Sequence, residues 1–234
     1  MENSTFPLKK DAKTAGFLYF LHLVLVVYGV IFISSKIGIS GTDEMAITIL
    51  AHEFLFRTGI AARLFSLIPT LLLAFKLYRL LVNVNDFQAK LLFIIMIISV
   101  PFQFIAEVFN LTSLMIVKGE LLRSMDVSQK HDLTVLYINI YNNIVSIGQV
   151  FWGLWLFPFG LLIYRSKFIP RVFGIILILG GTGYLVDFTA FLLSPNYRSV
   201  TVFALLLGFM CEIAIMLWLL LQGVKNKPSD KNEK

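Results

Sequence analysis

Apolar residues dominate six long stretches of the chain, and shorter polar stretches separate them. The six stretches cover residues 16–34, 59–81, 91–117, 135–164, 172–193 and 200–221. Each is close to, or longer than, the roughly 20 residues that a helix needs to cross a hydrocarbon core of about 30 Å. Lipid offers no hydrogen-bond partner to a free backbone N–H or C=O, so each stretch must be helical. The pattern therefore predicts an all-α fold, a polytopic integral membrane bundle of six transmembrane helices.

The six stretches make up one transmembrane domain of residues 15–223, which lies between an N-terminal segment (1–14) and a tail (224–234). The first stretch follows three lysines, as the core of a signal peptide does. Its apolar part exceeds the usual length of about 7–15 residues, and no A-x-A cleavage site follows it. We therefore expect it to remain in the protein as a membrane anchor.

Lysine and arginine residues near the ends of the stretches predict the orientation, because cytoplasmic loops carry an excess of both. Thirteen of them fall on the side that holds both termini, and five fall on the opposite side. The thirteen are Lys9, Lys10, Lys13, Lys76, Arg79, Lys90, Arg165, Lys167, Arg171, Lys225, Lys227, Lys231 and Lys234. The five are Lys36, Lys118, Arg123, Lys130 and Arg198. Both termini are predicted to be cytoplasmic.

Composition agrees with a membrane location. Of the 234 residues, 58% are hydrophobic and 15% are charged, with a formal net charge of +6. The excess of lysine and arginine on the predicted cytoplasmic side accounts for this positive charge, which also attracts anionic membrane lipids. We therefore expect membrane lipids as partners and no nucleic acid. The single cysteine, Cys211, excludes an intrachain disulfide. The sequence predicts no oligomeric state.

Charged and amide side chains inside the stretches are the candidate functional residues, because such groups are costly in lipid and face a bundle interior or a wet cavity. Helical rise places most of them near the middle or in the outer half of the membrane. The fourth stretch carries a polar stripe at helical spacing, and we expect this stripe to turn inward. Its members are Asn139, Asn142, Asn143, Ser146 and Gln149. The predicted ligand-binding residues are Arg57, Arg63, Gln103, Glu107, Asn139, Asn142, Asn143, Asp187 and Glu212.

The charges in these stretches do not balance. Two arginines, Arg57 and Arg63, face four carboxylates, which are Glu53, Glu107, Asp187 and Glu212. Arginine stays charged when it is buried, whereas a carboxylic acid can take up a proton. We therefore expect at least one of the buried acids to be protonated, or a cation to be bound.

Three functions are compatible with this pattern. The first is binding or transport of a small molecule, lipid or ion at a polar site in the outer half of the bundle. The second is an intramembrane enzyme that acts on a lipid or isoprenoid with a carboxylate as acid or base, which requires a pocket open sideways to lipid. The third is a membrane assembly or stress factor without a ligand. In that case the polar groups only hold helices together, at about 0.6 kcal/mol for each interhelical hydrogen bond.

Metal and cofactor chemistry has weaker support. His52-Glu53 begins like the zinc motif H-E-x-x-H, but Phe56 occupies the position of the second histidine. His22 in the first stretch has no obvious second ligand, so we interpret it as a hydrogen-bonded histidine between helices. We expect no metal and no cofactor. The segment 43–56 is interpreted as a helix that lies at the surface or extends the second span, with Asp43 as a plausible N-cap and with Ala46, Ile49, Leu50 and Phe54 near one face. Gly180, Gly181 and Gly183 are interpreted as close-packing positions.

Three segments carry a resemblance to a known family: 56–60 (FRTGI), 164–174 (YRSKFIPRVFG) and 183–187 (GYLVD). Together they resemble a bacterial membrane family catalogued only as domain of unknown function 4386, from about residue 15 to 223. The resemblance implies a six-span, multi-pass protein of the bacterial cytoplasmic (inner) membrane with no assigned activity and no site residues to carry over. Members of the family often carry a histidine near the position of Trp155. This chain has no histidine there.

Overall fold

The computed structural model describes residues 5–37, 44–194, 196 and 198–224, and the regular elements in these ranges are all helices. They are α1 (Thr5–Val26), the π-helical segment η1 (Val27–Phe32), α2 (Ile33–Ile37), α3 (Glu44–Ala51), α4 (Glu53–Leu81), α5 (Asp86–Val117), α6 (Val127–Ser166), α7 (Arg171–Leu193) and α8 (Arg198–Leu221). Six helical runs are long and apolar enough to cross a membrane. The predicted all-α, six-span fold is therefore confirmed, and the protein is a multi-pass membrane protein.

Short polar motifs define where the long helices begin. Before α6, Asp126 Oδ1 accepts the backbone N–H of Gln129 at 2.8 Å, and the Gln129 side chain accepts the N–H of Asp126 at 3.2 Å. This reciprocal pair is a capping box, which satisfies two donors at the helix start. Asn85 caps α5 in a similar way, by accepting the N–H of Gln88 at 2.9 Å.

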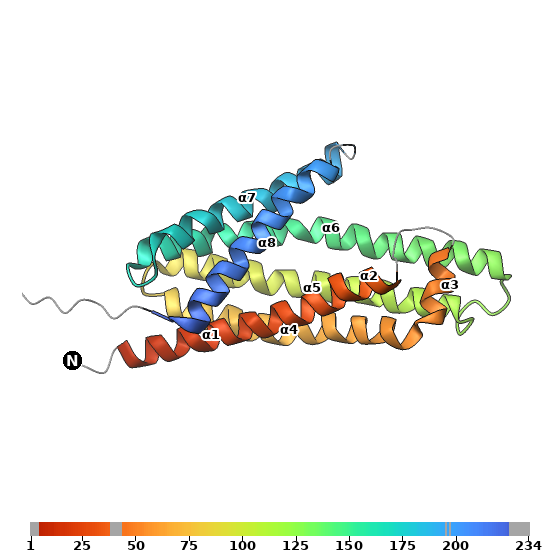
Figure 1. The fold of residues 1–234 in the computed structure, drawn as a ribbon, viewed down its shortest axis with the longest axis horizontal. Helices are drawn as coiled ribbons and strands as arrows, with labels where there is room; N and C mark the ends of the chain where they lie inside the picture. Colours follow the sequence, from red (N-terminus) through yellow and green to blue (C-terminus); the bar gives the residue numbers. More distant parts are fainter. Residues whose placement is uncertain (1–4, 38–43, 195, 197, 225–234) are drawn as a thin grey trace, which may run out of the picture. The chain divides into compact units, whose positions relative to one another are not determined.

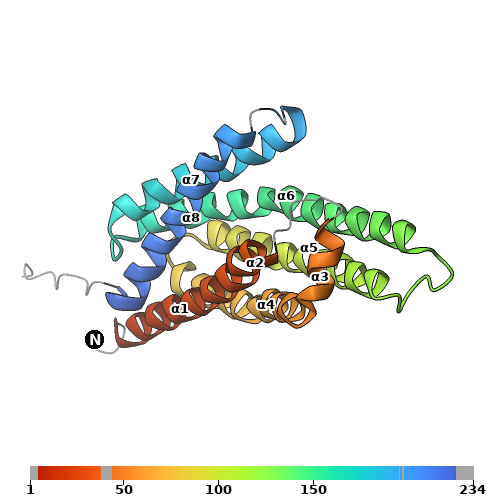
Figure 2. The same cartoon turned by 45° about the vertical axis from the view of Figure 1, so that its right-hand side comes forward.

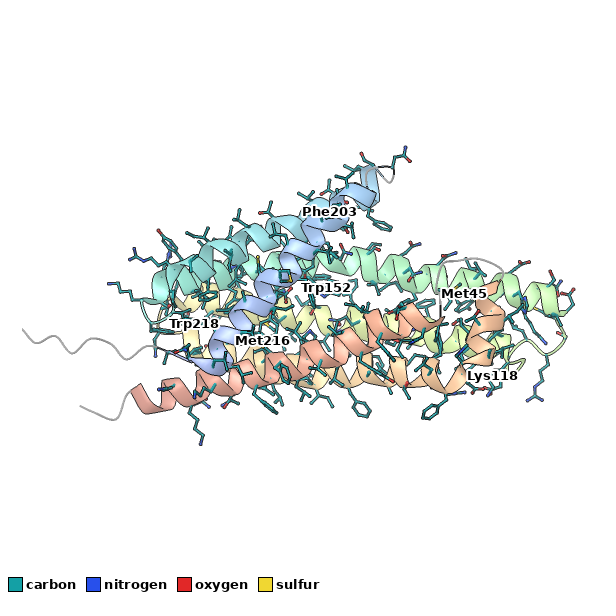
Figure 3. All side chains as sticks on the ribbon, in the orientation of Figure 1. Met45, Lys118, Trp152, Phe203, Met216 and Trp218 are labelled. Atoms are coloured by element: carbon teal, nitrogen blue, oxygen red, sulfur yellow. The ribbon has the colours of Figure 1, made fainter. Side chains whose placement is uncertain are left out.

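The chain divides into two compact units, which are described separately. The first unit contains Met1–Phe20, Leu71–Ile97 and Gln149–Lys234. Within it α7 and α8 lie side by side (Figure 1). Their backbones approach closely at Gly183, where an added Cβ would lie 2.3 Å from the Ala204 carbonyl oxygen. Further along the same pair, the rings of Phe173 and Trp218 are 5.1 Å apart, and Trp218 is labelled in Figure 3. The prediction that Gly180, Gly181 and Gly183 permit close helix packing is confirmed.

The second unit contains Leu21–Thr70 and Ile98–Gly148. Its core joins α2, α3 and parts of α4, α5 and α6 through ten buried residues: Ile33, Ile37, Met45, Ala46, Ile49, Phe56, Ile60, Leu114, Val117 and Ile138. The short helix α3 turns away from the direction of α4 (Figure 2). Lys118, which is labelled in Figure 3, follows the end of α5. Its Nζ lies 2.7 Å from a Glu120 carboxylate oxygen and 2.9 Å from one of Glu53. These two hydrogen bonds, to Glu120 and then to Glu53, raise the pKa of Lys118.

The helix predicted over residues 43–56 is divided into two in the structure, and the alternative that it extends the second span holds for residues 53–56, which belong to α4. The structure breaks it at His52, between α3 and α4, and Asp43 lies outside the described residues. Ala46 and Ile49 are buried, but Leu50 and Phe54 are exposed, Phe54 to 82%. The break explains the exposure of Phe54, which belongs to α4, but not that of Leu50, which lies in α3 with Ala46 and Ile49. Pro69, Pro101 and Pro158 lie inside helices that continue through them.

Candidate functional site

An arginine and a glutamate from different helices form a buried ion pair in the second unit. Arg63 on α4 donates from Nε to Glu107 Oε1 at 2.5 Å and from a terminal nitrogen to Oε2 at 3.0 Å. The side chains are only 11% and 6% exposed. Two parallel N–H···O bonds fix the planar guanidinium against the carboxylate. The structure thus brings two of the predicted site residues into direct contact.

The surroundings of Arg63 use its remaining hydrogen-bonding capacity. Its other terminal nitrogen donates to the carbonyl oxygen of Gly29, in the π-helical segment η1. A Cβ at Gly29 would lie 2.7 Å from Arg63 Cγ, so the glycine makes room for the arginine. The Tyr141 ring lies 5.4 Å from the guanidinium carbon, and Asn110 donates to Glu107 Oε2 at 3.2 Å. All three guanidinium nitrogens have partners, so this pair is closed and neutralised.

A second polar centre, the tyrosine–glutamate centre, lies in the first unit and consists of Tyr19, Tyr184 and Glu212. The Tyr19 hydroxyl donates to Glu212 Oε2 at 2.5 Å, and the Tyr184 hydroxyl donates to Oε1 at 2.6 Å. These are the short distances typical of O–H donors to an ionised carboxylate. Glu212 is 7% exposed. Among the described residues, no lysine, arginine or histidine forms an ion pair with it.

Glycines and tryptophans hold the two tyrosines in place. Gly208 lies against the Tyr184 ring, where an added Cβ would be 2.7 Å from a ring carbon. The Trp152 ring meets Tyr184 edge-on at 6.2 Å, and the Trp155 ring lies 6.0 Å from that of Tyr19. The ring positions are therefore set by packing, which leaves each hydroxyl directed at the carboxylate.

Asp187 occupies a third polar position, also in the first unit. It is 3% exposed, and Thr201 on α8 donates to its Oδ1 at 2.7 Å. Thr201 also lines an open groove of about 470 Å³ on α7 and α8, together with Thr182, Thr189 and apolar residues such as Val186. A carboxylate with a hydroxyl partner thus lies beside a mainly apolar groove.

Among the described residues, no hydrogen bond or ion pair joins the other predicted site residues to these groups. Arg57 is exposed and pairs with Glu53 at 2.8 Å, one helical turn away. Gln103 is only partly buried. His22, a weaker candidate, has Nδ1 3.2 Å from the Ser66 carbonyl oxygen and 2.9 Å from Thr70 Oγ1, as expected for a hydrogen-bonded histidine between helices. Within the part of the chain that the structure describes, no three His, Cys, Asp or Glu side chains gather as a metal site.

The expectation that the stripe on the fourth stretch turns inward is wrong for its three asparagines. Asn139, Asn142 and Asn143 are exposed, whereas Ser146 and Gln149 are buried. The reason is the choice of packing face. In the second unit, α6 meets α5 through Thr134, whose hydroxyl lies 3.4 Å from the Ser113 carbonyl oxygen, and Tyr137, whose ring is 5.8 Å from Phe109. At about 100° per residue, the asparagines lie on a different side of the helix.

Sequence reasoning missed the tyrosines and Gly29. Tyr19, Tyr141 and Tyr184 count as apolar in a hydropathy pattern, so their hydroxyls give no signal within a span. One signal was present: Tyr184 lies in the segment 183–187, which contains Asp187. A tyrosine close to a buried acid is a candidate hydrogen-bond donor, because a buried phenol usually has a partner.

Comparison with known proteins places the chain by family. Residues 14–223 match the family described as a domain of unknown function, DUF4386. An uncharacterised protein of Archaeoglobus fulgidus is 32% identical over 98 residues, which is 41% of this chain and 52% of the archaeal protein. The matched region thus spans about half of that relative. No solved structure matches the chain significantly.

Proposed function

We propose, for a chain that belongs to the DUF4386 family, that it binds or transports a small molecule, lipid or ion through polar groups buried in its six-helix bundle. The proposed location is the cytoplasmic membrane of a bacterium, with both termini in the cytoplasm. The bias of lysine and arginine along the sequence supports this orientation. The archaeal relative indicates that similar sequences also occur outside bacteria.

The observation that carries the proposal is Glu212, a carboxylate buried inside a span with two hydroxyl donors and no ion-pair partner among the described residues. A charge in the membrane interior is costly. A protein that only needed to hold its helices together could use hydrogen bonds between neutral side chains instead. The contrast with Glu107 is direct, since Arg63 neutralises that carboxylate at a similar degree of burial. A carboxylate without a counter-ion is available to a proton, a cation or a polar ligand.

Ion flux through the purified protein in liposomes tests the proposal. We expect wild-type protein to dissipate an imposed gradient of H⁺, Na⁺ or K⁺ faster than protein-free liposomes, as followed by trapped ion-sensitive dyes. The Glu212→Gln variant should lose this flux. Glu120→Gln is the matched control, because Glu120 is an exposed glutamate whose partner is Lys118, outside the spans.

A binding function without transport is tested by thermal unfolding in the presence of lipids and small molecules. A ligand that binds the folded protein stabilises it, by about 2.7 kcal/mol at a hundredfold excess over its dissociation constant. The proposal is abandoned if no gradient decays faster than in protein-free liposomes and no compound raises the unfolding temperature of wild type more than that of Glu212→Gln.

The groove on α7 and α8 favours a second candidate, an intramembrane enzyme that acts on a lipid or isoprenoid. Such an enzyme needs a pocket open to lipid beside an acid and a polar partner, and Thr201 lines the groove while it donates to Asp187. The carboxylate would act as the general acid or base. Purified protein in native-lipid nanodiscs should then change the lipid composition seen by mass spectrometry, and Asp187→Asn should stop this change. An unchanged composition with wild type rejects the enzyme.

A further inference from the structure

The tyrosine–glutamate centre is built so that its carboxyl group has hydrogen-bond partners with and without a proton. A phenol hydroxyl can donate or accept, whereas guanidinium and amide N–H groups only donate. When Glu212 is ionised, both hydroxyls donate to it, as the structure shows at 2.5 and 2.6 Å. When it is protonated, its new O–H can donate to one phenol oxygen, while the other phenol continues to donate to the remaining carboxyl oxygen.

The Glu107 site differs because it includes a charged partner. The Arg63 guanidinium and the Asn110 amide group donate N–H to the carboxylate, and the Tyr141 hydroxyl also hydrogen-bonds to it. A proton on Glu107 would displace one of these donors and leave Arg63 charged without a counter-ion. The two buried glutamates therefore differ in their partners: Glu107 is paired with a guanidinium, whereas Glu212 has two phenol donors and no ion-pair partner among the described residues.

The ligands around Glu212 suit a proton better than a metal cation. Hard cations take six or more oxygen ligands, many of them carboxylate or carbonyl oxygens. Here the described contacts offer two carboxylate oxygens and two phenol oxygens, which are fewer than such a cation takes. The neighbouring groups are Cys211 on the same helix and the rings of Trp152 and Trp155 on α6, which add no charge.

We infer that Glu212 is a reversible proton-binding site in which the hydroxyls of Tyr19 and Tyr184 exchange donor and acceptor roles. The inference rests on the proposed function and specifies its ion as H⁺. In the binding step, a hydronium ion from the water at the membrane surface gives up a proton: one of its O–H bonds breaks, an O–H bond forms at one Glu212 oxygen, and water is left. Release reverses the step, with water accepting the proton.

Infrared spectroscopy of the protein in lipid nanodiscs, with isotope-labelled glutamate, tests this site. Between about pH 6 and pH 10, above the range in which exposed glutamates titrate, we expect a carboxylic-acid C=O band that appears and disappears reversibly in wild type. The band should be lost in Glu212→Gln and kept in Glu120→Gln. In Tyr19→Phe and Tyr184→Phe it should move to higher frequency, because each variant removes a hydrogen bond to the acid.

Several outcomes overturn the inference. A titrating band that persists in Glu212→Gln assigns the proton to another group, and a wild-type spectrum without a reversible band excludes the site. If Glu212→Gln does not fold, the frequency in the two phenylalanine variants decides, since an unchanged frequency contradicts the donor arrangement.

The liposome experiment separates this inference from the proposed function. Flux of Na⁺ or K⁺ that depends on Glu212, without a protonation band, refutes the proton site and keeps the function. A protonation band with no flux and no ligand binding supports the site and refutes the function.

Discussion

At the scale of single residues, the Arg63–Glu107 pair is tolerated in the bundle because its hydrogen-bonding capacity is largely used. The guanidinium donates from all three nitrogens, to both carboxylate oxygens and to the Gly29 carbonyl. Buried ion pairs add little net stability compared with apolar replacements, but the loss of one partner leaves an uncompensated charge. This asymmetry makes the pair testable by single and double substitution.

Glu107→Gln should destabilise the protein by about 3–5 kcal/mol, because Arg63 would remain charged and buried without a carboxylate. Arg63→Met should cost a similar amount for the opposite reason. The double variant Arg63→Met with Glu107→Leu removes both charges and should recover most of the loss. Unfolding in mixed detergent micelles, followed by circular dichroism, measures the three variants. Additive losses in the double variant would show that the two residues do not act as a pair.

The sequence identified the costly residues but not their partners. Arg63, Glu107, Asp187 and Glu212 stand out because a charge interrupts an apolar stretch, and all four are largely or wholly buried. The prediction that all four share one site stays a prediction. The structure places Arg63 and Glu107 together in the second unit, while Asp187 and Glu212, in the first, have hydroxyl partners of their own. Hydropathy cannot find a hydroxyl on an aromatic ring, and this is why Tyr19 and Tyr184 were missed.

At the scale of elements, helix length explains why the polar stripe on α6 was misjudged. The helix has 40 residues, or about 60 Å at 1.5 Å per residue, which is twice the thickness of a hydrocarbon core. Asn143 is about 33 Å along the helix from Arg165, a residue expected near the cytoplasmic end. With the predicted orientation, an amide at that distance is expected at the outer edge of the hydrocarbon or beyond it, where water can satisfy it. Periodicity shows which face is polar, but not what covers that face.

The contact between α7 and α8 gives a prediction for a helix pair. Gly183→Ala should destabilise the protein by about 1–3 kcal/mol, because its Cβ would lie 2.3 Å from the Ala204 carbonyl oxygen and force the backbones apart. Gly148→Ala is the matched control, since a Cβ there meets no atom within 4 Å. It should stabilise α6 by about 0.5–1 kcal/mol through helix propensity. Thermal unfolding in the same detergent compares the two variants, and equal effects would contradict the close contact.

At the scale of the whole molecule, the number of spans followed from apolar length alone, because each run exceeds what a soluble core requires. Helix ends were less predictable. The structure begins α1 at Thr5 and α6 at Val127, well before the apolar stretches start at residues 16 and 135. A polar segment with good helix formers or a capping box extends a helix beyond the lipid, as Asp126 and Gln129 do for α6. Division into two units depends on long-range contacts that no local pattern records.

Membrane orientation is the remaining whole-molecule property, and single cysteines test it. In a Cys211→Ser background, Asn83→Cys probes the connection between α4 and α5, and Ser124→Cys probes that between α5 and α6; both positions are exposed. The lysine and arginine bias predicts that an impermeant maleimide on intact cells labels position 124, and labels position 83 only after permeabilisation. A permeant maleimide should label both, which controls for reactivity. Labelling of position 83 alone in intact cells would invert the topology, and the lysine-rich tail would then lie outside the cell.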